Sequence, residues 1–168
     1  GHAMMGNDLI NVTALEQFQP RFETIDGMRV SYRACGDGPT LVLLAGFGQS
    51  SAWWRHFVEP YARLFRVLAP DFRGFGYSDK PRSGYLIEDQ ATLVLGLLSK
   101  LGFSKISIVG LSFGGVVALK IALMSPHLVE KLVLVSTPFL RGPSINRPNM
   151  NTVPFVLRLL RNPVAARV

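Results

Sequence analysis

Cysteine is almost absent from the 168-residue sequence. Cys35 stands alone, so no disulfide can form within the chain, and we expect it to be a buried strand residue rather than a thiol nucleophile. Long apolar runs are also missing. Runs such as residues 41–46 and 132–135 are far shorter than the ~20 residues of a membrane-spanning helix, and no charged leader follows Met5. These absences predict a cytoplasmic protein with no membrane partner.

Acidic residues are missing from the C-terminal part of the sequence, because none follows Glu130. Five of the 18 Lys and Arg residues lie beyond residue 140 with nothing to offset them, so most of the net charge of +7 arises there. A basic protein could bind nucleic acid, but no Lys/Arg block is interleaved with aromatic residues. We therefore expect no nucleic-acid partner.

Short apolar segments alternate with amphipathic segments of helical length along residues 21–136. The apolar segments are rich in Val, Ile and Leu without strict alternation, which is typical of strands buried on both faces of a parallel sheet. The pair Asp26-Gly27 predicts a tight hairpin turn between the first two. The alternation predicts an α/β fold, an open, mostly parallel twisted sheet with helices on both faces. The expected strands are residues 21–25, 28–34, 40–45, 66–69, 106–109 and 131–136, and the expected helices are residues 51–64, 87–101 and 113–124.

The pattern changes after Ser136. Residues 137–151 hold three prolines, which is typical of an irregular segment, whereas residues 153–168 again have helical character. Residues 1–4, Gly-His-Ala-Met, look like a remnant of protease cleavage and cloning and are set aside. We therefore expect a core domain at residues 5–136 and the start of a cap, or lid, at residues 137–168.

A Gly-x-Ser-x-Gly motif, Gly110-Leu111-Ser112-Phe113-Gly114, lies between an expected strand and an expected helix. This is the arrangement of a nucleophile elbow, in which small residues permit a sharp turn that exposes the serine hydroxyl at a helix N-terminus. The alternative is a glycine-rich turn with an inert serine. A dinucleotide site is not favoured, because the spacing lacks Gly-x-Gly-x-x-Gly. The motif predicts that Ser112 is a nucleophile.

A second glycine-rich turn, Gly46-Phe47-Gly48, follows the strand expected at residues 40–45. Acyl transfer requires two backbone N–H groups aimed at the developing oxyanion, and we expect these to come from Phe47 and Phe113. An ordinary turn between strand and helix is the alternative. We expect substrate to contact Gly46, Gly48 and Trp53, and we expect no metal and no cofactor.

Residues 71–81 read Asp-Phe-Arg-Gly-Phe-Gly-Tyr-Ser-Asp-Lys-Pro. They match Asp-x-Arg-Gly-x-Gly-x-Ser-Asp-x-Pro, the loop after the fourth strand in the α/β-hydrolase superfamily. With the two glycine-rich turns, residues 22–136 resemble that superfamily, of the small esterase, lactonase, perhydrolase and C–C bond hydrolase type. The resemblance implies an α/β-hydrolase fold lacking its last two strands, with a supporting role for this loop. Members that resemble dehalogenases or epoxide hydrolases carry Asp at the elbow, so Ser112 implies attack on a carbonyl group.

The chain departs from the superfamily pattern in two places. The superfamily commonly has His-Gly where this sequence has Ala45-Gly46, so the bracing contacts of that imidazole are missing. Its triad acid and histidine follow the serine in chain order. Here only His127 follows Ser112, in a surface position, and His56 is expected to pack or to line a pocket. The triad acid and base are therefore expected to be absent from this chain, which would be inactive or feeble alone.

The strand expected at residues 131–136 would then be an apolar sheet edge, which favours aggregation. We expect the missing C-terminal half or a second copy of the chain to cover it. The expected function is hydrolysis of a small hydrophobic carboxylic ester, or a related acyl substrate, through an acyl-enzyme. Two alternatives stay open: a C–C bond hydrolase acting on a ring-cleavage product, and a non-catalytic fragment or binding module that needs a C-terminal partner segment.

Overall fold

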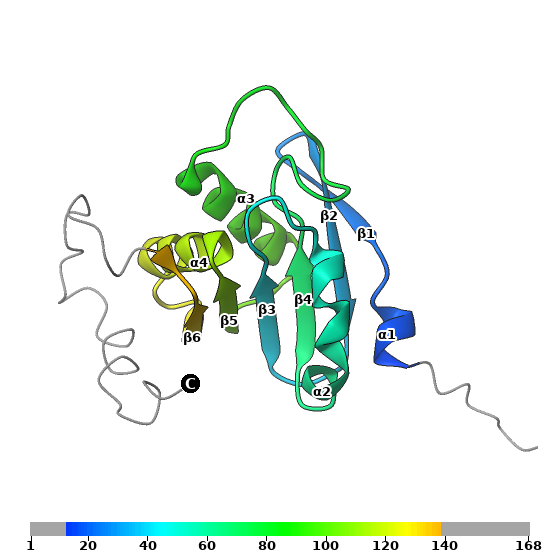
Figure 1. The fold of residues 1–168 in the computed structure, drawn as a ribbon. Helices are drawn as coiled ribbons and strands as arrows, with labels where there is room; N and C mark the ends of the chain where they lie inside the picture. The colour runs from blue at the N-terminus through cyan, green and yellow to red at the C-terminus, as the bar shows by residue number, and fades with distance from the viewer. Residues whose placement is uncertain (1–12, 139–168) are drawn as a thin grey trace, which may run out of the picture.

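The computed structural model describes residues 13–138, which form a six-stranded sheet with helices on both faces (Figure 1). The strands are β1 (Arg21–Ile25), β2 (Met28–Cys35), β3 (Thr40–Leu44), β4 (Arg66–Pro70), β5 (Ile106–Leu111) and β6 (Val129–Val135). The helices are α1 (Ala14–Gln17), the 3₁₀-helix η1 (Ser51–His56), α2 (Val58–Ala62), α3 (Ile87–Lys100) and α4 (Phe113–Met124). The strand order is β1-β2-β4-β3-β5-β6, antiparallel from β1 to β4 and parallel from β4 to β6. The predicted mostly parallel α/β architecture is confirmed.

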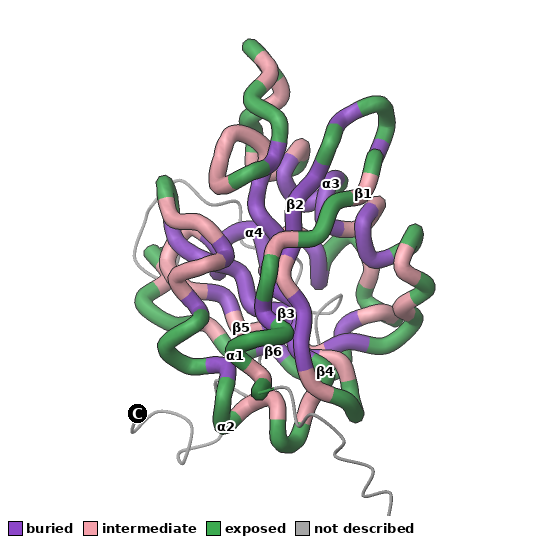
Figure 2. The backbone as a smooth tube through the Cα atoms, turned by 90° about the vertical axis from the view of Figure 1, so that its right-hand side faces the viewer, coloured by how far each residue is buried: buried purple, intermediate pink, exposed green. Residues whose placement is uncertain are grey.

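Two hydrophobic layers, one on each face, bury the central strands. Helices α3 and α4 pack on one face, and α1, η1 and α2 pack on the other (Figure 1). Along β3, Val42 and Leu44 belong to the first layer, while Leu41 and Leu43 belong to the second. This burial on both faces explains why the strand sequences are apolar without alternation. Figure 2 shows the buried residues running through the middle of the structure.

The hairpin turn between β1 and β2 forms where the sequence predicts it. Ile25 pairs with Met28, and the two turn residues Asp26 and Gly27 have φ values of 48° and 77°. Two successive positive φ angles are the requirement of a type I′ turn, which Asp-Gly meets better than most pairs.

The continuous helix predicted over residues 51–64 is wrong. The structure instead has η1 and α2 separated at Phe57, whose φ is −123°. The reason is Pro60, because a continuous helix would need its missing N–H to bond the carbonyl of His56. As the third residue of α2, Pro60 lies in the first turn, where no N–H has an acceptor within the helix.

The two ends of the described chain differ from expectation in detail. Helix α1 was not predicted, although Thr13 and Glu16 form a capping box that the sequence displays. Strand β6 starts two residues earlier than expected and lies at an edge of the described sheet, with Val133 and Val135 exposed. Apart from residues 137 and 138, the expected cap lies outside the described residues. Within residues 13–138, no helix is long and apolar enough to span a bilayer.

Candidate active site

Ser112 occupies a sharp turn between β5 and α4, as the motif predicts. Its φ of 51° and ψ of −114° lie outside the regions that an L-residue with a side chain favours. Its N–H donates to the carbonyl of Val135 at 2.8 Å, and its carbonyl accepts from the N–H of Gly115 at 2.9 Å. The surrounding structure therefore holds Ser112 in a strained conformation, which is a common property of functional residues.

Glycines around Ser112 allow the first turn of α4 to approach the sheet closely. A Cβ at Gly110 would lie 2.5 Å from the Cα of Gly115. A Cβ at Gly114 would collide with the carbonyl oxygens of Leu44 and Ala45, at the end of β3. The elbow thus touches the chain just before the Gly46-Phe47-Gly48 turn, so the two glycine-rich turns are neighbours in the structure.

Gln49 braces the turn that follows β3. Its side-chain Oε1 accepts the N–H of Gly46 at 2.9 Å, and its own N–H donates to the carbonyl of Gly46 at 3.1 Å. Gly48 within this turn has a φ of 74°. The histidine that commonly precedes this turn in the superfamily is replaced by Ala45. Here the amide side chain of Gln49 braces Gly46 instead. Sequence reasoning missed Gln49, although a polar side chain three residues after the turn's first glycine was the available signal.

Phe47 and Phe113, the two expected oxyanion donors, are neighbours in space. Their ring centroids lie 5.6 Å apart, edge to face. Phe113 is the first residue of α4, so its N–H has no acceptor within the helix. Within residues 13–138 the N–H of Phe47 has no acceptor either, and Phe47 as a whole residue is 75% exposed. Neither N–H group is therefore occupied by an acceptor within the described residues.

Asp71 anchors the loop of residues 71–81. The side chain is buried, and its Oδ1 accepts the N–H of Ser51 at 2.6 Å. Its Oδ2 accepts the hydroxyl of Ser31 and the N–H of Tyr77, the latter at 3.3 Å. Asp71 thereby joins β2, η1 and its own loop, and it directs no free carboxylate oxygen at the elbow. This geometry fits the supporting role that the resemblance implies.

Two further contacts fix the same loop. The side-chain amide of buried Gln90, in α3, accepts the N–H of Arg73 at 2.8 Å and donates to the carbonyl of Arg73 at 3.0 Å. The carboxylate of Asp79 accepts the N–H of Arg29, in β2, at 2.8 Å. The loop is therefore tied to α3 through the side chain of Gln90 and to β2 through its own Asp79 side chain.

None of the other residues singled out from the sequence forms a hydrogen bond with Ser112. Trp53 packs edge to face on Trp54 and tilted on Phe57, at centroid distances of 5.1 and 5.0 Å, in the layer of η1 and α2. His56 is exposed and touches Phe57. Within the described part of the chain, the hydroxyl of Ser112 has no hydrogen-bond partner.

His127 is likewise exposed. Its backbone carbonyl accepts a hydrogen bond from the Lys105 ammonium at 2.8 Å. Residues 13–138 also contain no group of three His, Cys, Asp or Glu side chains that could hold a metal ion.

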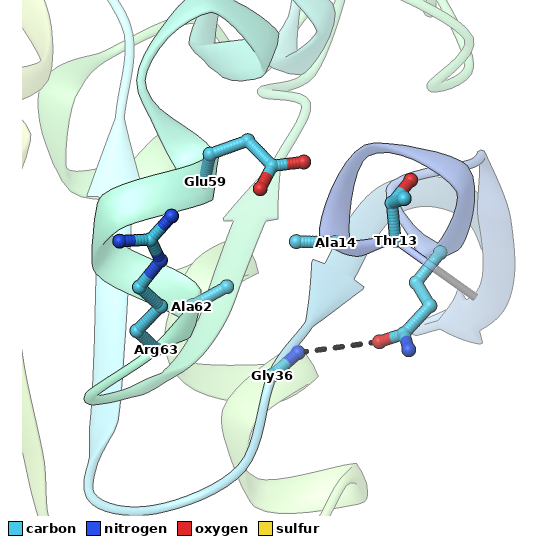
Figure 3. Close-up of a pocket in the computed structure, with 7 residues that line it drawn as sticks. Thr13, Ala14, Gly36, Glu59, Ala62 and Arg63 are labelled. Atoms are coloured by element: carbon cyan, nitrogen blue, oxygen red, sulfur yellow. Dashed lines mark hydrogen bonds between the residues drawn. The ribbon is translucent and has the colours of Figure 1, made fainter. Parts of the chain in front are cut away.

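Two surface pockets of the described residues lie away from the elbow. One, of about 370 Å³, is formed by α1, α2 and the chain after β2 (Figure 3). The figure shows Glu59 and Arg63 on one side and the hydrogen bond from the Gly36 N–H on the other. The second, of about 480 Å³, includes Asp26, Arg73 and Lys80. Neither pocket contains Ser112, Phe47 or Phe113.

Known proteins that resemble the chain include several hydrolases. It is 41% identical over 116 residues to an uncharacterized protein of Mycobacterium tuberculosis, covering 69% of this chain and 34% of that protein. It is 41% identical over 111 residues to a soluble epoxide hydrolase of Corynebacterium sp., covering 66% and 39%. It is 35% identical over 113 residues to the 2-hydroxy-6-oxo-2,4-heptadienoate hydrolase of Pseudomonas putida, covering 65% and 41%. The chain therefore spans about a third to two fifths of the length of these relatives.

Solved structures agree with the sequence relatives. The epoxide hydrolase CorEH superposes with a TM-score of 0.71 at 34% identity, covering 88% of this chain and 53% of that one. Est816, described as an N-acyl homoserine lactone degrading enzyme, superposes with a TM-score of 0.67 at 32% identity, covering 70% and 45%. A family model described as the alpha/beta hydrolase fold matches residues 39–167, which include both glycine-rich turns and the loop of residues 71–81. The chain therefore belongs to the α/β-hydrolase fold family.

Proposed function

We propose that the chain carries the nucleophile and the oxyanion site of a serine hydrolase that cleaves carboxylic esters through an acyl-enzyme. The observation that carries the proposal is the strained backbone of Ser112, at the junction of β5 and α4. Strain of this kind persists only where the surrounding contacts enforce it, and here Val135 and Gly115 do so. In this proposal the Ser112 hydroxyl attacks the carbonyl carbon, and the Phe47 and Phe113 N–H groups stabilise the resulting oxyanion.

The nucleophile type favours ester chemistry over epoxide opening. Several similar proteins are named epoxide hydrolases. The resemblance to such enzymes implies an Asp at the elbow, whereas this chain has Ser112. A serine alkoxide forms an ester that water can later cleave only if the attacked carbon is an acyl carbon. Est816, whose description names a lactone-type substrate, supports the same reaction class.

Activation of Ser112 requires a base and, usually, an acid that orients the base. His56 and His127 are the histidines of the described residues, and neither is hydrogen-bonded to Ser112. We therefore place the base and the acid in a further C-terminal segment, on the same polypeptide or on a partner. Because that segment is essential in this proposal, residues 1–168 alone should be inactive or feeble.

The substrate proposed is a small to medium ester with an apolar acyl or alcohol group. The support is the exposed ring of Phe47, which stands beside the proposed oxyanion donors with 75% of its surface accessible. Burying such a ring against an apolar group on binding is favourable by about 25 cal/mol per Å². No metal or cofactor enters this proposal.

A fluorophosphonate probe tests the proposal, because it labels only an activated serine. The chain and the protein extended by its C-terminal segment are each treated with the probe, and the labelled peptide is identified by mass spectrometry. We expect labelling at Ser112 in the extended protein, little or none in the chain, and none in a Ser112→Ala variant. If neither preparation is labelled, the chain is a non-catalytic fragment or a binding module and the proposed function is wrong.

A C–C bond hydrolase is the second candidate, because a relative of that name from Pseudomonas putida is 35% identical to the chain. Such an enzyme would use the same serine and oxyanion site. The two reactions are separated by substrate: p-nitrophenyl esters of short acids against a vinylogous diketone. Turnover of the diketone at a rate equal to or above that of the esters would favour the second candidate.

A further inference from the structure

Four phenylalanines from three separate segments form one aromatic group beside Ser112. Phe47 belongs to the turn after β3, Phe72 and Phe75 to the loop after β4, and Phe113 to the start of α4. Phe75 contacts the other three, with centroid distances of 5.3 Å to Phe47, 6.4 Å to Phe113 and 6.5 Å to Phe72. All these pairs are edge to face, a geometry that stabilises aromatic pairs beyond the burial of their surface.

The two proposed oxyanion donors differ in how firmly the backbone holds them. The N–H of Phe113 is fixed by α4 and by the hydrogen bonds of Ser112. Phe47 lies between Gly46 and Gly48, and most of its surface is exposed. The two hydrogen bonds of Gln49 hold Gly46. The glycines on both sides still leave Phe47 itself conformational freedom, which a contact of its own ring would reduce.

Phe75 is suited to supply such a contact, because its own position is fixed. Its N–H donates to the carbonyl of Phe72 at 3.0 Å, and its carbonyl accepts from the N–H of Ser78 at 3.1 Å. Phe72 is 1% exposed and Ser78 is 2% exposed, so both belong to the core. The ring of Phe75 therefore joins the glycine-flanked turn of Phe47 to the interior of the protein.

We propose that Phe75 is a positioning residue that holds the Phe47 N–H in register with the Phe113 N–H. The inference rests on the proposed function, since it names the residue that keeps the two N–H donors of that reaction in position. Losing one oxyanion donor typically costs on the order of 100-fold in rate. A donor that is present but poorly held should cost less, about 10-fold, and the loss should appear in kcat because the interaction forms only in the transition state.

The kinetic test uses Phe75→Leu in the preparation that fluorophosphonate labels, with short and long p-nitrophenyl esters. We expect kcat to fall about 10-fold for every ester, with KM changed less than about 2-fold. Phe22→Leu is the matched control, because Phe22 is also a partly exposed ring (39% of its surface), on the distant strand β1, and contacts Arg29. A loss confined to KM, or one that grows with acyl length, would show a substrate contact and overturn the positioning role.

Amide relaxation provides a test that does not require activity. In the ¹⁵N-labelled protein extended by its C-terminal segment, we expect the order parameter of the Phe47 N–H to be near 0.85 and to fall below about 0.6 in Phe75→Leu, while that of Phe113 is unchanged. An unchanged Phe47 order parameter overturns the inference, even if the enzyme proves to be a serine hydrolase.

A second variant covers the case in which Phe75→Leu does not fold. Phe47→Leu removes the contact of the Phe47 ring with Phe75, and with it the contact with Phe113, at a residue that is 75% exposed. We expect the same loss of order at residue 47, and an unchanged value would again contradict the inference. If instead wild-type protein shows no Ser112-dependent hydrolysis, the proposed function fails separately, and the relaxation result still decides the role of Phe75.

Discussion

At the scale of single residues, Gly114 is a position where the neighbouring backbone lies so close that only glycine fits. Replacing glycine by alanine inside a helix normally stabilises it by up to about 1 kcal/mol. Here the sign should be reversed, because the added Cβ meets the carbonyl oxygens of Leu44 and Ala45, which cannot move without the sheet. We expect Gly114→Ala to lower the free energy of unfolding by about 2–3 kcal/mol, measured by urea denaturation.

The control for this prediction is Gly46→Ala. A Cβ at Gly46 would lie 2.9 Å from Oε1 of Gln49, the end of a flexible side chain that can turn away, with loss of its hydrogen bond to the Gly46 N–H. That substitution should therefore lower the free energy of unfolding by about 1 kcal/mol, less than Gly114→Ala. Equal losses in both variants would contradict the explanation from backbone contact.

Cys35 allows a prediction about pH dependence. Burial, with a smaller contribution from nearby Glu59, raises the pKa of its thiol from 9.0 to about 11. The folded protein therefore holds this proton more tightly than the unfolded chain does. The resulting contribution to the free energy of unfolding is fully present below pH 9 and is lost as the pH rises from 9 to 11. We expect the free energy of unfolding to fall over that range by on the order of 2 kcal/mol more than in Cys35→Ala.

The same burial should keep Cys35 unreactive. In native protein at pH 8 we expect no alkylation of Cys35 by iodoacetamide within an hour, and rapid alkylation in urea, both followed by mass. Equal pH dependence of stability in wild type and Cys35→Ala, or rapid native alkylation, would show that the thiol is accessible.

At the scale of elements, the carboxylate of Asp71 connects β2, η1 and the loop after β4. Three donors, from Ser31, Ser51 and Tyr77, converge on its two oxygens in the interior. In Asp71→Asn the amide nitrogen would face a donor and leave it without a partner. We expect the free energy of unfolding to fall by about 2–4 kcal/mol, measured by thermal and urea unfolding.

Asp37→Asn is the control for Asp71→Asn. Asp37 is exposed in the turn before β3 and makes no hydrogen bond or ion pair with the described residues. The same change there should leave stability within about 0.5 kcal/mol of the wild type. Should Asp71→Asn be equally mild, its carboxylate would not be the anchor of this loop.

Elements could be predicted from the sequence wherever a local pattern determines them. Helix α4 begins and ends at the predicted residues, and the Asp26-Gly27 turn forms as expected, because both are fixed by neighbouring residues. The division between η1 and α2 was missed, although Pro60 signals it. The bracing by Gln49 and the aromatic contacts of Phe75 depend on how distant segments pack. Local patterns therefore predicted the nucleophile turn, but not the contacts that hold its surroundings.

At the scale of the whole molecule, the sheet has two edges of different character. Strand β1 lies at one edge and carries the charged residues Arg21 and Glu23. Strand β6 lies at the other, and its outer side has no pairing strand within residues 13–138. Its exposed residues Val133 and Val135 present apolar surface beside these unpaired backbone groups. Such an edge is a template for pairing with another strand.

We therefore expect the isolated chain to self-associate through β6. Val133→Lys places a charge on a side chain that is 46% exposed, so it should disfavour pairing of a second strand with little cost to the fold. We expect it to lower the aggregated fraction in light scattering several-fold, with the melting temperature changed by less than about 3 °C.

Leu64→Lys is the control, because Leu64 is 69% exposed but lies away from the sheet edge, between α2 and β4. If both substitutions reduce aggregation equally, general charge and not the β6 edge governs association. If only Val133→Lys does so, the chain associates through the β6 edge.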